Sequence, residues 1–533
     1  MASNQFIVVA FSEDRTVLAG GNPLGRTNAV LTINSGTHTF TLNGEQDYEP
    51  KSHRRKVANT SPVEPLKITF QKLLCIWLVV GCLALVGCAH HPVNAKLDRY
   101  DPGLGYRFTN TPPGASNSDE VFVVMAFSGG GTRAAALAYG VLEELGKTTV
   151  QVNGTGRRLL DEVDIISSIS GGSFTAAYYG LHRDSRWPEF ERRFLRKNVT
   201  LALALRLISP VNWFRLCSRH FDRIDMAAEY FDKQVFSHGT YADIAGHQAR
   251  PFIILNATDM SLVTQFEFIQ EQFDVISSDL GPFPVSRAVA ASSAFPILLS
   301  PVTLHNYGLT SNGYTVPQWI SDALEDRQLA PREHAHAKAT KSYFDATNRP
   351  FVHLLDGGIG DNLGLRGVTY AMTSIQGLWS LKHLLNTKIK HLLVITVNAK
   401  NGEPRTSDRR HNAPGIGGVF GVVTTGPMGR YSDETVQYLS ETFETWRQEN
   451  SVARKYNEAV PDAKLPMRNE VQFYHIEVNF QDLPESETAL RDRIIQLGTT
   501  YHLSDAAIDD LRRAASILIG GSPELARLKE NLQ

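Results

Sequence analysis

Apolar runs that end in glycine turns, each followed by a helical pattern, dominate the middle of the chain. Residues 121–125 form an uninterrupted apolar run, which is typical of a strand buried on both faces of a parallel sheet. Glycines at 129–131 follow, and from Ala134 to Leu145 the apolar positions recur on one side of a helix. The same order begins again at 163–167, and buried strands are also expected at 252–255 and 391–397. Strands that alternate with helices predict an α/β fold with a mainly parallel sheet covered on both faces.

The first 66 residues show a different pattern, of short alternating strands. Strands are expected at 6–11, 28–33 and 37–42, with turns of glycine, asparagine and proline between them. The segment loosely resembles PEGA-type β modules in its order of Asn22-Pro23-Leu24-Gly25-Arg26-Thr27, Gly36-Thr37-His38 and Asp47-Tyr48-Glu49-Pro50. Residues 1–66 are therefore expected to form a small β module. The alternative is an extension that is not translated, ahead of a later start.

An uncharged segment at 73–89 follows Lys67 and Lys72. A basic flank before a short apolar run is typical of a signal sequence or a first membrane span. The run ends in Leu85-Val86-Gly87-Cys88, which resembles the lipobox of bacterial lipoproteins and implies lipidation of Cys88. A plain membrane span with an incidental cysteine is the alternative. We expect an anchor at 67–88, a proline-rich tether at 89–119, and a bacterial envelope protein whose larger part lies outside the cytoplasm.

The composition of the chain excludes several classes of partner, cofactor and fold. The 53 Lys and Arg nearly balance the 55 Asp and Glu, so the chain lacks the basic excess of a nucleic-acid binder. A hydrophobic share of 42% excludes disorder as the main state. Three of the 4 cysteines lie at 75–88, which excludes a disulfide scaffold. The acidic residues and histidines lack the spacing of calcium or zinc sites, so neither a metal nor another cofactor is expected.

The first candidate site is the loop Ser128-Gly129-Gly130-Gly131, between a predicted strand and a predicted helix. Consecutive glycines let the backbone approach a ligand, and N–H groups at a helix N-terminus carry partial positive charge. Such a loop binds a phosphate or a developing oxyanion. No Lys-Ser/Thr pair follows the glycines, unlike in a phosphate-binding loop. Arg133, beside the loop, either contacts a lipid phosphate or packs within the protein.

Two further strand ends carry candidate catalytic side chains. Ser168-Ile169-Ser170-Gly171-Gly172 approximates the nucleophile elbow GxSxG, with Ser168 in place of the first glycine. The nucleophile of an elbow sits in a strained turn with its hydroxyl above the sheet, so its neighbours must be small. Around Ser170 these neighbours are Ser168 and Gly172. Asp356-Gly357-Gly358 places a carboxylate where it can reach across the sheet. The alternative there is an ordinary Asp-Gly turn.

In this order the three sites resemble the bacterial patatin-like phospholipase family, whose members are lipid acyl hydrolases. Residues 285–296, a run of small residues that ends in Phe-Pro, are similar to a further segment of that family. The resemblance implies a three-layer α/β/α catalytic domain over 120–400, with residues 401–533 packed on it as a C-terminal extension. This sequence departs from the family pattern at Ser128, Ala134 and Ser168.

The resemblance also implies a mechanism and a substrate class. Ser170 is the nucleophile toward a phospholipid or other acyl-lipid ester, Asp356 is the general base, and the N–H groups of Gly129, Gly130 and Gly131 hold the oxyanion. A rival interpretation is an α/β-hydrolase triad with a histidine as its base. The candidates for that single histidine are His383, His391, His411, His475 and His502. A membrane-anchored binding protein without activity is the other alternative.

Two more segments bear on packing and membrane contact. Residues 183–214 combine arginines and aromatic residues with the apolar stretch 201–208. This pattern fits either a membrane interface or a charged surface helix followed by a buried one. A C-terminal helix is expected from about Ser504, with its core stripe at Ile508, Leu511, Ala515 and Leu518.

Overall fold

The computed structural model divides into two compact units, one containing residues 1–90 and 210–220 and the other residues 91–209 and 221–533. The structure describes residues 4–72, 90, 92–296, 298–309, 312–325, 327–328, 331–373, 377–381, 389–400, 416–460, 465 and 471–533.

The expected anchor at 73–89, including Cys88, lies outside the described residues. Of the helices that the structure describes, none is by itself both long and apolar enough to cross a membrane. Helices α5 (Val199–Ile208) and α6 (Pro210–Leu216) are long and apolar enough for a membrane span only when both are taken together, and the pair is bent by 79°.

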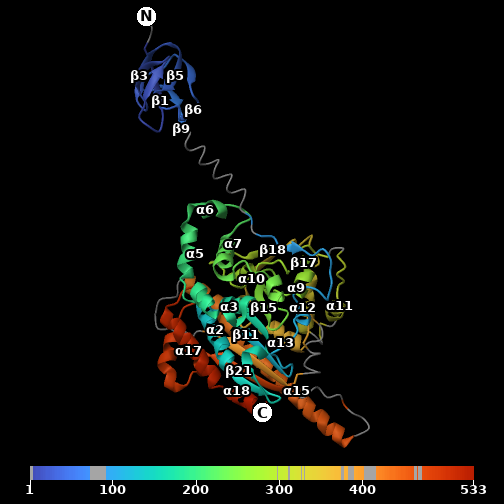
Figure 1. Ribbon diagram of the computed structural model, residues 1–533. Coiled ribbons are helices and arrows are strands. Elements are labelled where there is room, and N and C mark those ends of the chain that lie inside the picture. Colours follow the sequence, from blue (N-terminus) through green and yellow to red (C-terminus); the bar gives the residue numbers. More distant parts are fainter. Residues whose placement is uncertain are drawn as a thin grey trace. The chain divides into compact units, whose positions relative to one another are not determined.

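The first unit contains two main β-sheets (Figure 1). β1 (Asn4–Ala10) pairs antiparallel with β4 (Val30–Asn34) and parallel with β8 (Leu66–Thr69). The second sheet has the order β3 (Asn22–Arg26), β2 (Thr16–Ala19), β5 (Gly36–Leu42), β7 (His53–Val57), and a short pair joins β6 (Tyr48–Glu49) to β9 (Gln71–Lys72). Expected strands at 6–11, 28–33 and 37–42 correspond to β1, β4 and β5. β4 starts later than expected because Asn28 has a φ of 60°, which a strand does not accommodate.

The second unit is organised around an eight-stranded sheet in the order β18-β19-β15-β14-β11-β20-β21, with β16 paired to β15 (Figure 1). Its parallel strands are β15 (Phe252–Asp259), β14 (Val163–Ile169), β11 (Val121–Phe127), β20 (His391–Asn398) and β21 (Gln472–Asn479). Antiparallel pairings add β18 (Val302–His305), β19 (Phe351–Asp356) and β16 (Thr264–Glu267). The sheet is therefore mixed, with the expected parallel strands forming its larger part.

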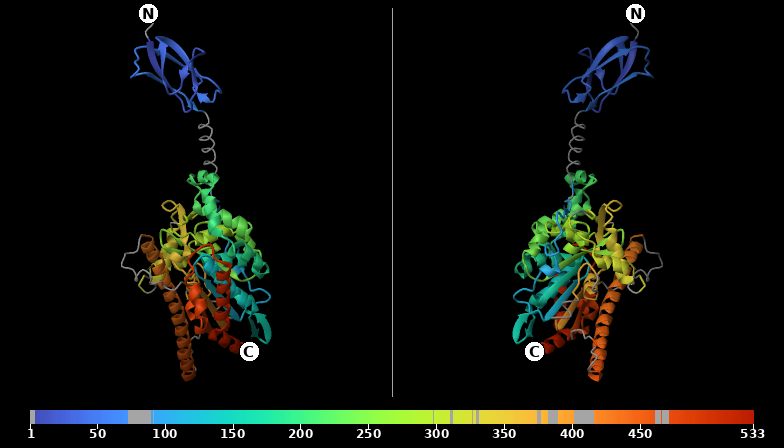
Figure 2. Two further views of the ribbon diagram at one scale, coloured as in Figure 1. Left: turned by 90° about the vertical axis from the view of Figure 1, so that its left-hand side faces the viewer. Right: turned by 90° about the vertical axis from the view of Figure 1, so that its right-hand side faces the viewer.

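Helices flank this sheet (Figure 2). α2 (Thr132–Lys147) follows β11, and both α3 (Gly171–His182) and α10 (Val285–Ser292) pack against β15. α17 (Asp505–Gly520) crosses α2 so closely that a Cβ on Gly140 would lie 2.8 Å from the Cα of Arg512. The expected core residues Ile508, Leu511 and Ala515 of α17 are fully buried. The C-terminal part of the chain thus supplies both the last strand of the sheet and part of its cover.

Residues 183–214 differ from the second interpretation of their sequence, in which a charged surface helix is followed by a buried one. Phe190, in α4 (Trp187–Phe190), and Phe194 are fully buried, and Phe194 stacks on Phe174 of α3. Some arginines of this stretch form ion pairs, Arg193 with Glu189 and Arg196 with Glu191. Helix α5 was expected to be buried by the second interpretation, but its leucines are largely exposed. The expectation of a buried α5 is therefore wrong, and Phe190 and Phe194, which precede it, are the side chains of this stretch that enter the core.

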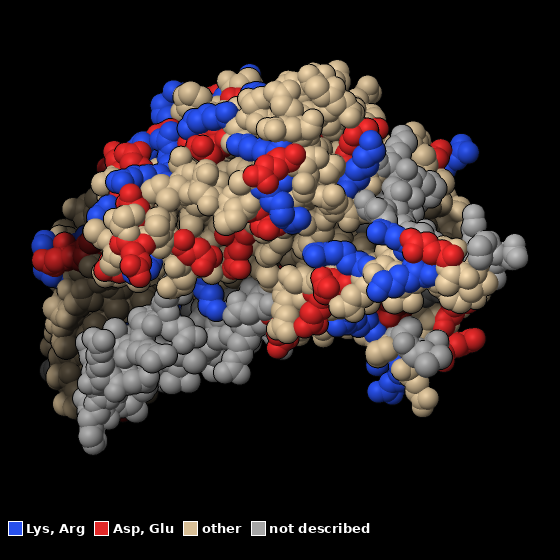
Figure 3. Space-filling view, turned by 90° about the horizontal axis from the view of Figure 1, so that it is seen from below, with Lys and Arg blue, Asp and Glu red and all other residues tan. Residues whose placement is uncertain are grey.

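Charges of both signs are interspersed on the face of the molecule seen in Figure 3. This agrees with the formal net charge of −2. That face provides no continuous basic surface of the kind that binds a phosphate backbone.

Candidate active site

Ser170 occupies the sharp turn between β14 and α3. Its φ of 48° and ψ of −117° are sparsely populated by residues with a side chain, and it is 7% exposed. Both following glycines are required by close packing. A Cβ on Gly171 would lie 2.1 Å from the carbonyl oxygen of Gly131, and a Cβ on Gly172 would lie 2.7 Å from the Cβ of Phe127. The chain therefore forms a strained elbow whose serine lies beside the glycine loop.

A chain of serine hydroxyls supports this elbow. The N–H of Ser170 donates to Oγ of Ser292 at 2.8 Å. Oγ of Ser292 lies 2.9 Å from Oγ of Ser173, which in turn lies 3.1 Å from Oγ of Ser168. Ser168, which replaces the first glycine of the motif, is thus accommodated as a buried and hydrogen-bonded residue. Sequence reasoning missed Ser292, because residues 285–296 show only a run of small side chains.

The register of the sheet brings Asp356 to Ser170. Ile169 of β14 pairs with Asn256 of β15, and the next residue of β15, Ala257, pairs with Asp356 of β19. β19 runs antiparallel to β15 and ends at this level. Its last side chain therefore lies across β15 from the residue that follows Ile169, which is Ser170.

The carboxylate of Asp356 is buried and hydrogen-bonded. Its Oδ1 accepts the N–H of Gly358 at 2.8 Å, and the carboxylate also interacts with the hydroxyl of Ser170. Burial raises the pKa of Asp356 to about 6, against the opposite effect of these two hydrogen bonds. Asp356 is therefore mostly ionised at neutral pH, while it contacts a hydroxyl group from which it can accept a proton.

The backbone N–H groups of the glycine loop are not all available to an oxyanion. The N–H of Gly129 donates to the carbonyl oxygen of Asn362 at 3.2 Å, so this predicted oxyanion donor is occupied. Gly130 and Gly131, with φ of 140° and 62°, show no hydrogen bond from their N–H groups to any residue that the structure describes. Gly171, the first residue of α3, has an N–H without an intrahelical acceptor. Sequence reasoning did not include Gly171 among the donors, although the residue after an elbow nucleophile commonly serves this role.

Residues far along the chain hold the glycine loop in place. The N–H of Thr132 donates to the carbonyl oxygen of Thr500 at 2.8 Å. Arg133 is buried, and its guanidinium donates to the carbonyl oxygens of Ala399 and Leu497. Burial lowers the pKa of Arg133 to about 10. Arg133 is therefore a packing residue, and its alternative interpretation as a contact to a lipid phosphate is wrong.

Ser128 also departs from the family pattern for a visible reason. Its Oγ accepts the N–H of Ala399 at 2.8 Å, which ties the end of β11 to the end of β20. A glycine at this position would lose that bond, whereas serine keeps it within a fully packed strand end.

The histidines required by the rival triad lie elsewhere. His391 Nδ1 is 3.2 Å from the hydroxyl of Tyr474, and His475 Nε2 is 3.0 Å from the hydroxyl of Thr396. His502 is exposed, while His383 and His411 lie outside the described residues. Among the residues for which contacts are described, no histidine hydrogen-bonds to Ser170 or to Asp356.

The glycine loop, the elbow and the Asp356 turn fall within one stretch that a family model recognises. Residues 125–369 match the patatin-like phospholipase family. This patatin-like domain supports a lipid acyl hydrolase, as the resemblance of the sequence motifs predicted. β20, β21 and α17 lie beyond the matched range but complete the same sheet and its cover. None of the curated proteins compared with the chain matches it.

Several solved structures are similar to the chain at low identity. Human GIVD cytosolic phospholipase A2 has a TM-score of 0.39 and 12% identity, over 100% of this chain and 79% of that chain. The same human protein in complex with methyl gamma-linolenyl fluorophosphonate has a TM-score of 0.34 and 10% identity, over 97% and 73%. VipD from Legionella pneumophila has a TM-score of 0.27 and 10% identity, over 84% and 73%.

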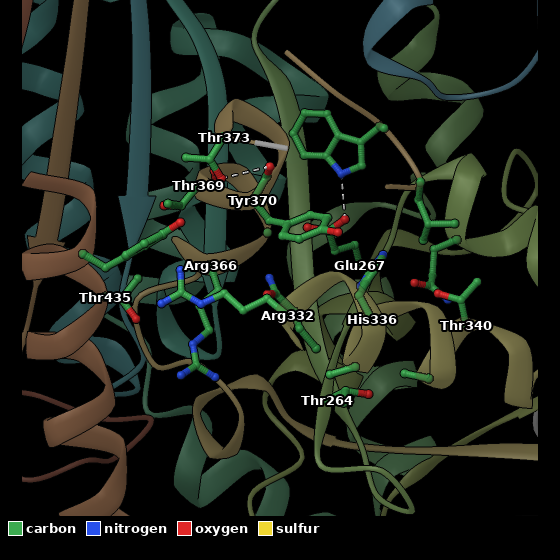
Figure 4. Close-up of a pocket in the computed structure, with 18 of the residues that line it drawn as sticks. Thr264, Glu267, Arg332, His336, Thr340, Arg366, Thr369, Tyr370, Thr373 and Thr435 are labelled. Carbon is green, nitrogen blue, oxygen red and sulfur yellow. Dashed lines mark hydrogen bonds between the residues drawn. The ribbon is translucent and has the colours of Figure 1, made fainter. Parts of the chain in front are cut away.

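Figure 4 shows a further pocket, of about 460 Å³. Residues of β16, α12 (Pro331–Ser342), α13 (Arg366–Thr373) and α15 (Ile416–Ala459) line it, whereas Ser170 and Asp356 do not. Within it, Nε1 of Trp379 donates to Glu267 at 2.9 Å, and burial raises the pKa of Glu267 to about 7. Over the described part of the chain, no three His, Cys, Asp or Glu side chains are grouped as metal ligands.

Proposed function

We propose that this chain is a serine esterase of membrane lipids, with Ser170 as the nucleophile and Asp356 as the general base. The sheet register that brings the buried carboxylate of Asp356 across β15 from Ser170 carries the proposal. The strained elbow and the family match over 125–369 support it. The substrate is a phospholipid or another acyl lipid with a carboxylic ester.

The proposed reaction has two steps. Oγ of Ser170 attacks the ester carbonyl while its proton passes to Asp356, and the N–H groups of Gly130, Gly131 and Gly171 are the donors for the oxyanion. The ester C–O bond then breaks, the alcohol leaves with the proton from Asp356, and the acyl group remains on Ser170. Water attacks this acyl-enzyme, gives a proton to Asp356, and releases the fatty acid as the serine regains its proton.

The pKa of Asp356 predicts the pH dependence of activity. Because this pKa is raised to about 6, the carboxyl is protonated at lower pH and cannot accept the serine proton. We expect kcat/KM for a soluble ester to rise with pH and to reach half its maximum near pH 6. The measurement is a pH profile of kcat/KM in the free enzyme. A midpoint that moved only when a histidine was replaced would favour the triad instead.

A fluorophosphonate probe tests the proposed function. Such a probe phosphonylates an activated serine, so we expect one labelled peptide, which contains Ser170. The Ser170→Ala variant should lose the label, whereas Ser516→Ala, on α17, should retain it. Fatty acid released from phospholipid vesicles is the parallel measurement. A label that persists in Ser170→Ala would contradict the nucleophile, and an unlabelled, inactive native protein would contradict the esterase.

We also propose that Cys88 is lipidated and holds the chain in a bacterial cell envelope, with the catalytic unit outside the cytoplasm. The lipobox-like sequence Leu85-Val86-Gly87-Cys88 supports this proposal. Cys88→Ser is expected to abolish incorporation of labelled palmitate and to release the protein from the membrane fraction. A variant that stays in the membrane fraction, from a native chain that takes up no palmitate, would indicate a plain span at 67–88.

A further inference from the structure

Helix α5 exposes apolar side chains that a helix of a soluble protein usually turns inward. Leu201 is 53% exposed, Leu205 59% and Ile208 64%. Their spacing of i, i+4 and i+7 places these three on one face. Val199 is fully buried, and Leu203 packs against the core from the other side of the helix. The outer face of α5, where polar residues are usual, is therefore a leucine and isoleucine surface.

The chain around this face is basic. From 192 to 209 there is no Asp or Glu, whereas the basic residues are Arg192, Arg193, Arg196, Lys197 and Arg206. Arg193 and Arg196 form ion pairs with Glu189 and Glu191, whereas Arg192 and Lys197 are exposed. An apolar helix face flanked by cations is typical of helices that lie in the interface of an anionic bilayer.

α5 also begins beside the active site. The N–H of its first residue, Val199, donates to the carbonyl oxygen of Tyr501 at 3.2 Å. The neighbouring Thr500 accepts the N–H of Thr132, next to the glycine loop. The ring of Tyr501 lies 5.7 Å from that of Phe174 in α3, the helix that starts at the elbow. One loop thus connects the start of α5 to both the glycine loop and the helix after Ser170.

We propose that α5 is the membrane-contact helix of the catalytic unit, in which Leu201, Leu205 and Ile208 enter the outer layer of an anionic bilayer and bring the lipid ester to Ser170. This rests on the proposed function, because a membrane lipid is the substrate that such a contact delivers. The exposed cations Arg192 and Lys197 are complementary to anionic headgroups. The outer face lacks the hydrogen-bonding side chains that accompany apolar residues in most protein–protein interfaces.

The variant Leu201→Gln/Leu205→Gln/Ile208→Gln tests this contact in the full chain. Glutamine preserves helix propensity and removes the apolar surface. Activity is the readout, since residues 67–88 are expected to hold the chain at a membrane independently. On vesicles of equimolar phosphatidylcholine and phosphatidylglycerol, the rate should fall on the order of tenfold or more. Hydrolysis of a soluble short-chain ester and fluorophosphonate labelling should not change.

A matched control is Val452→Gln on α15, since Val452 is 64% exposed and lies on a different helix. It should leave both rates unchanged. An unchanged vesicle rate in the triple variant would overturn the role of α5 and leave the proposed function intact. Equal losses on vesicles and soluble ester would also overturn it, because α5 would then only support the fold. A native chain that hydrolyses neither substrate would instead contradict the proposed function.

Discussion

Asp356→Asn is expected to lower kcat/KM for a soluble ester by on the order of 10²–10⁴. Asparagine has nearly the same shape, and its Oδ1 can still accept the N–H of Gly358, but the amide cannot take the proton of Ser170. Ser170→Ala should cause a similar loss. The double variant should lose little more, since the two groups act as one unit. The measurement is kcat/KM for each single variant and for the double variant.

The stability of Asp356→Asn separates loss of the base from damage to the fold. In the folded protein the pKa of Asp356 is raised from 3.8 to about 6. The protonated carboxyl therefore stabilises the fold relative to the carboxylate, and this contribution to the free energy of unfolding is lost as the pH rises through that range. At neutral pH the neutral amide should therefore raise the free energy of unfolding by about 3 kcal/mol. A variant that is both inactive and less stable would indicate misfolding rather than a missing base.

Asp361→Asn is the matched control for this prediction. Asp361 is also buried, but its carboxylate accepts the N–H groups of Leu363 and Arg366 instead of a serine hydroxyl. Its loss of activity should be much smaller than that of Asp356→Asn. If Asp356→Asn kept near-native activity, the proposed dyad would be wrong.

Gly171→Ala is expected to have the second large effect, a loss of kcat/KM on the order of 10²–10³. The added Cβ would lie 2.1 Å from the oxygen and 2.6 Å from the nitrogen of Gly131, and both are backbone atoms. The elbow and the glycine loop must then move apart, which displaces the N–H groups proposed for the oxyanion. Rate constants for labelling by a fluorophosphonate, together with thermal unfolding, measure the effect.

Gly520→Ala provides the control for Gly171→Ala. Gly520 ends α17, and a Cβ there would meet nothing within 4 Å. It should leave labelling unchanged and alter stability only slightly. A Gly171→Ala protein that is labelled at the native rate would show that the close contact between elbow and loop is unnecessary for catalysis.

Local sequence signals predicted the catalytic elements well. β11 and β15 begin with uninterrupted apolar runs because both faces of each strand are covered, and β20 is apolar over most of its length for the same reason. The elbow at Ser170 was predictable because a backbone this strained needs small neighbours, which leave a recognisable sequence. The position of Asp356 followed from a strand end before two glycines. The register that brings it to Ser170, through an antiparallel β19, was not predictable from these residues alone.

Contacts between distant residues account for most of what sequence reasoning missed. Arg133 and Leu497 are 364 residues apart, and no periodicity marks such a pair. The role of Ser292 is hidden for the same reason, since it depends on α10 crossing near the elbow. The second interpretation of residues 183–214 did not expect the exposure of α5, because apolar composition predicts burial, whereas the buried side chains of this stretch include Phe190 and Phe194.

The contact of the loop at Thr500 with the glycine loop has a consequence for biosynthesis. Domains fold during synthesis from the N-terminus onward, so Ser170 and Asp356 emerge from the ribosome well before Thr500, the acceptor for Thr132. The glycine loop gains the support of Thr500 only after residues 1–499 have been made. A shorter chain therefore carries both members of the proposed dyad without the supported oxyanion loop, and we expect the proposed ester cleavage to begin only once the loop at Thr500 is present.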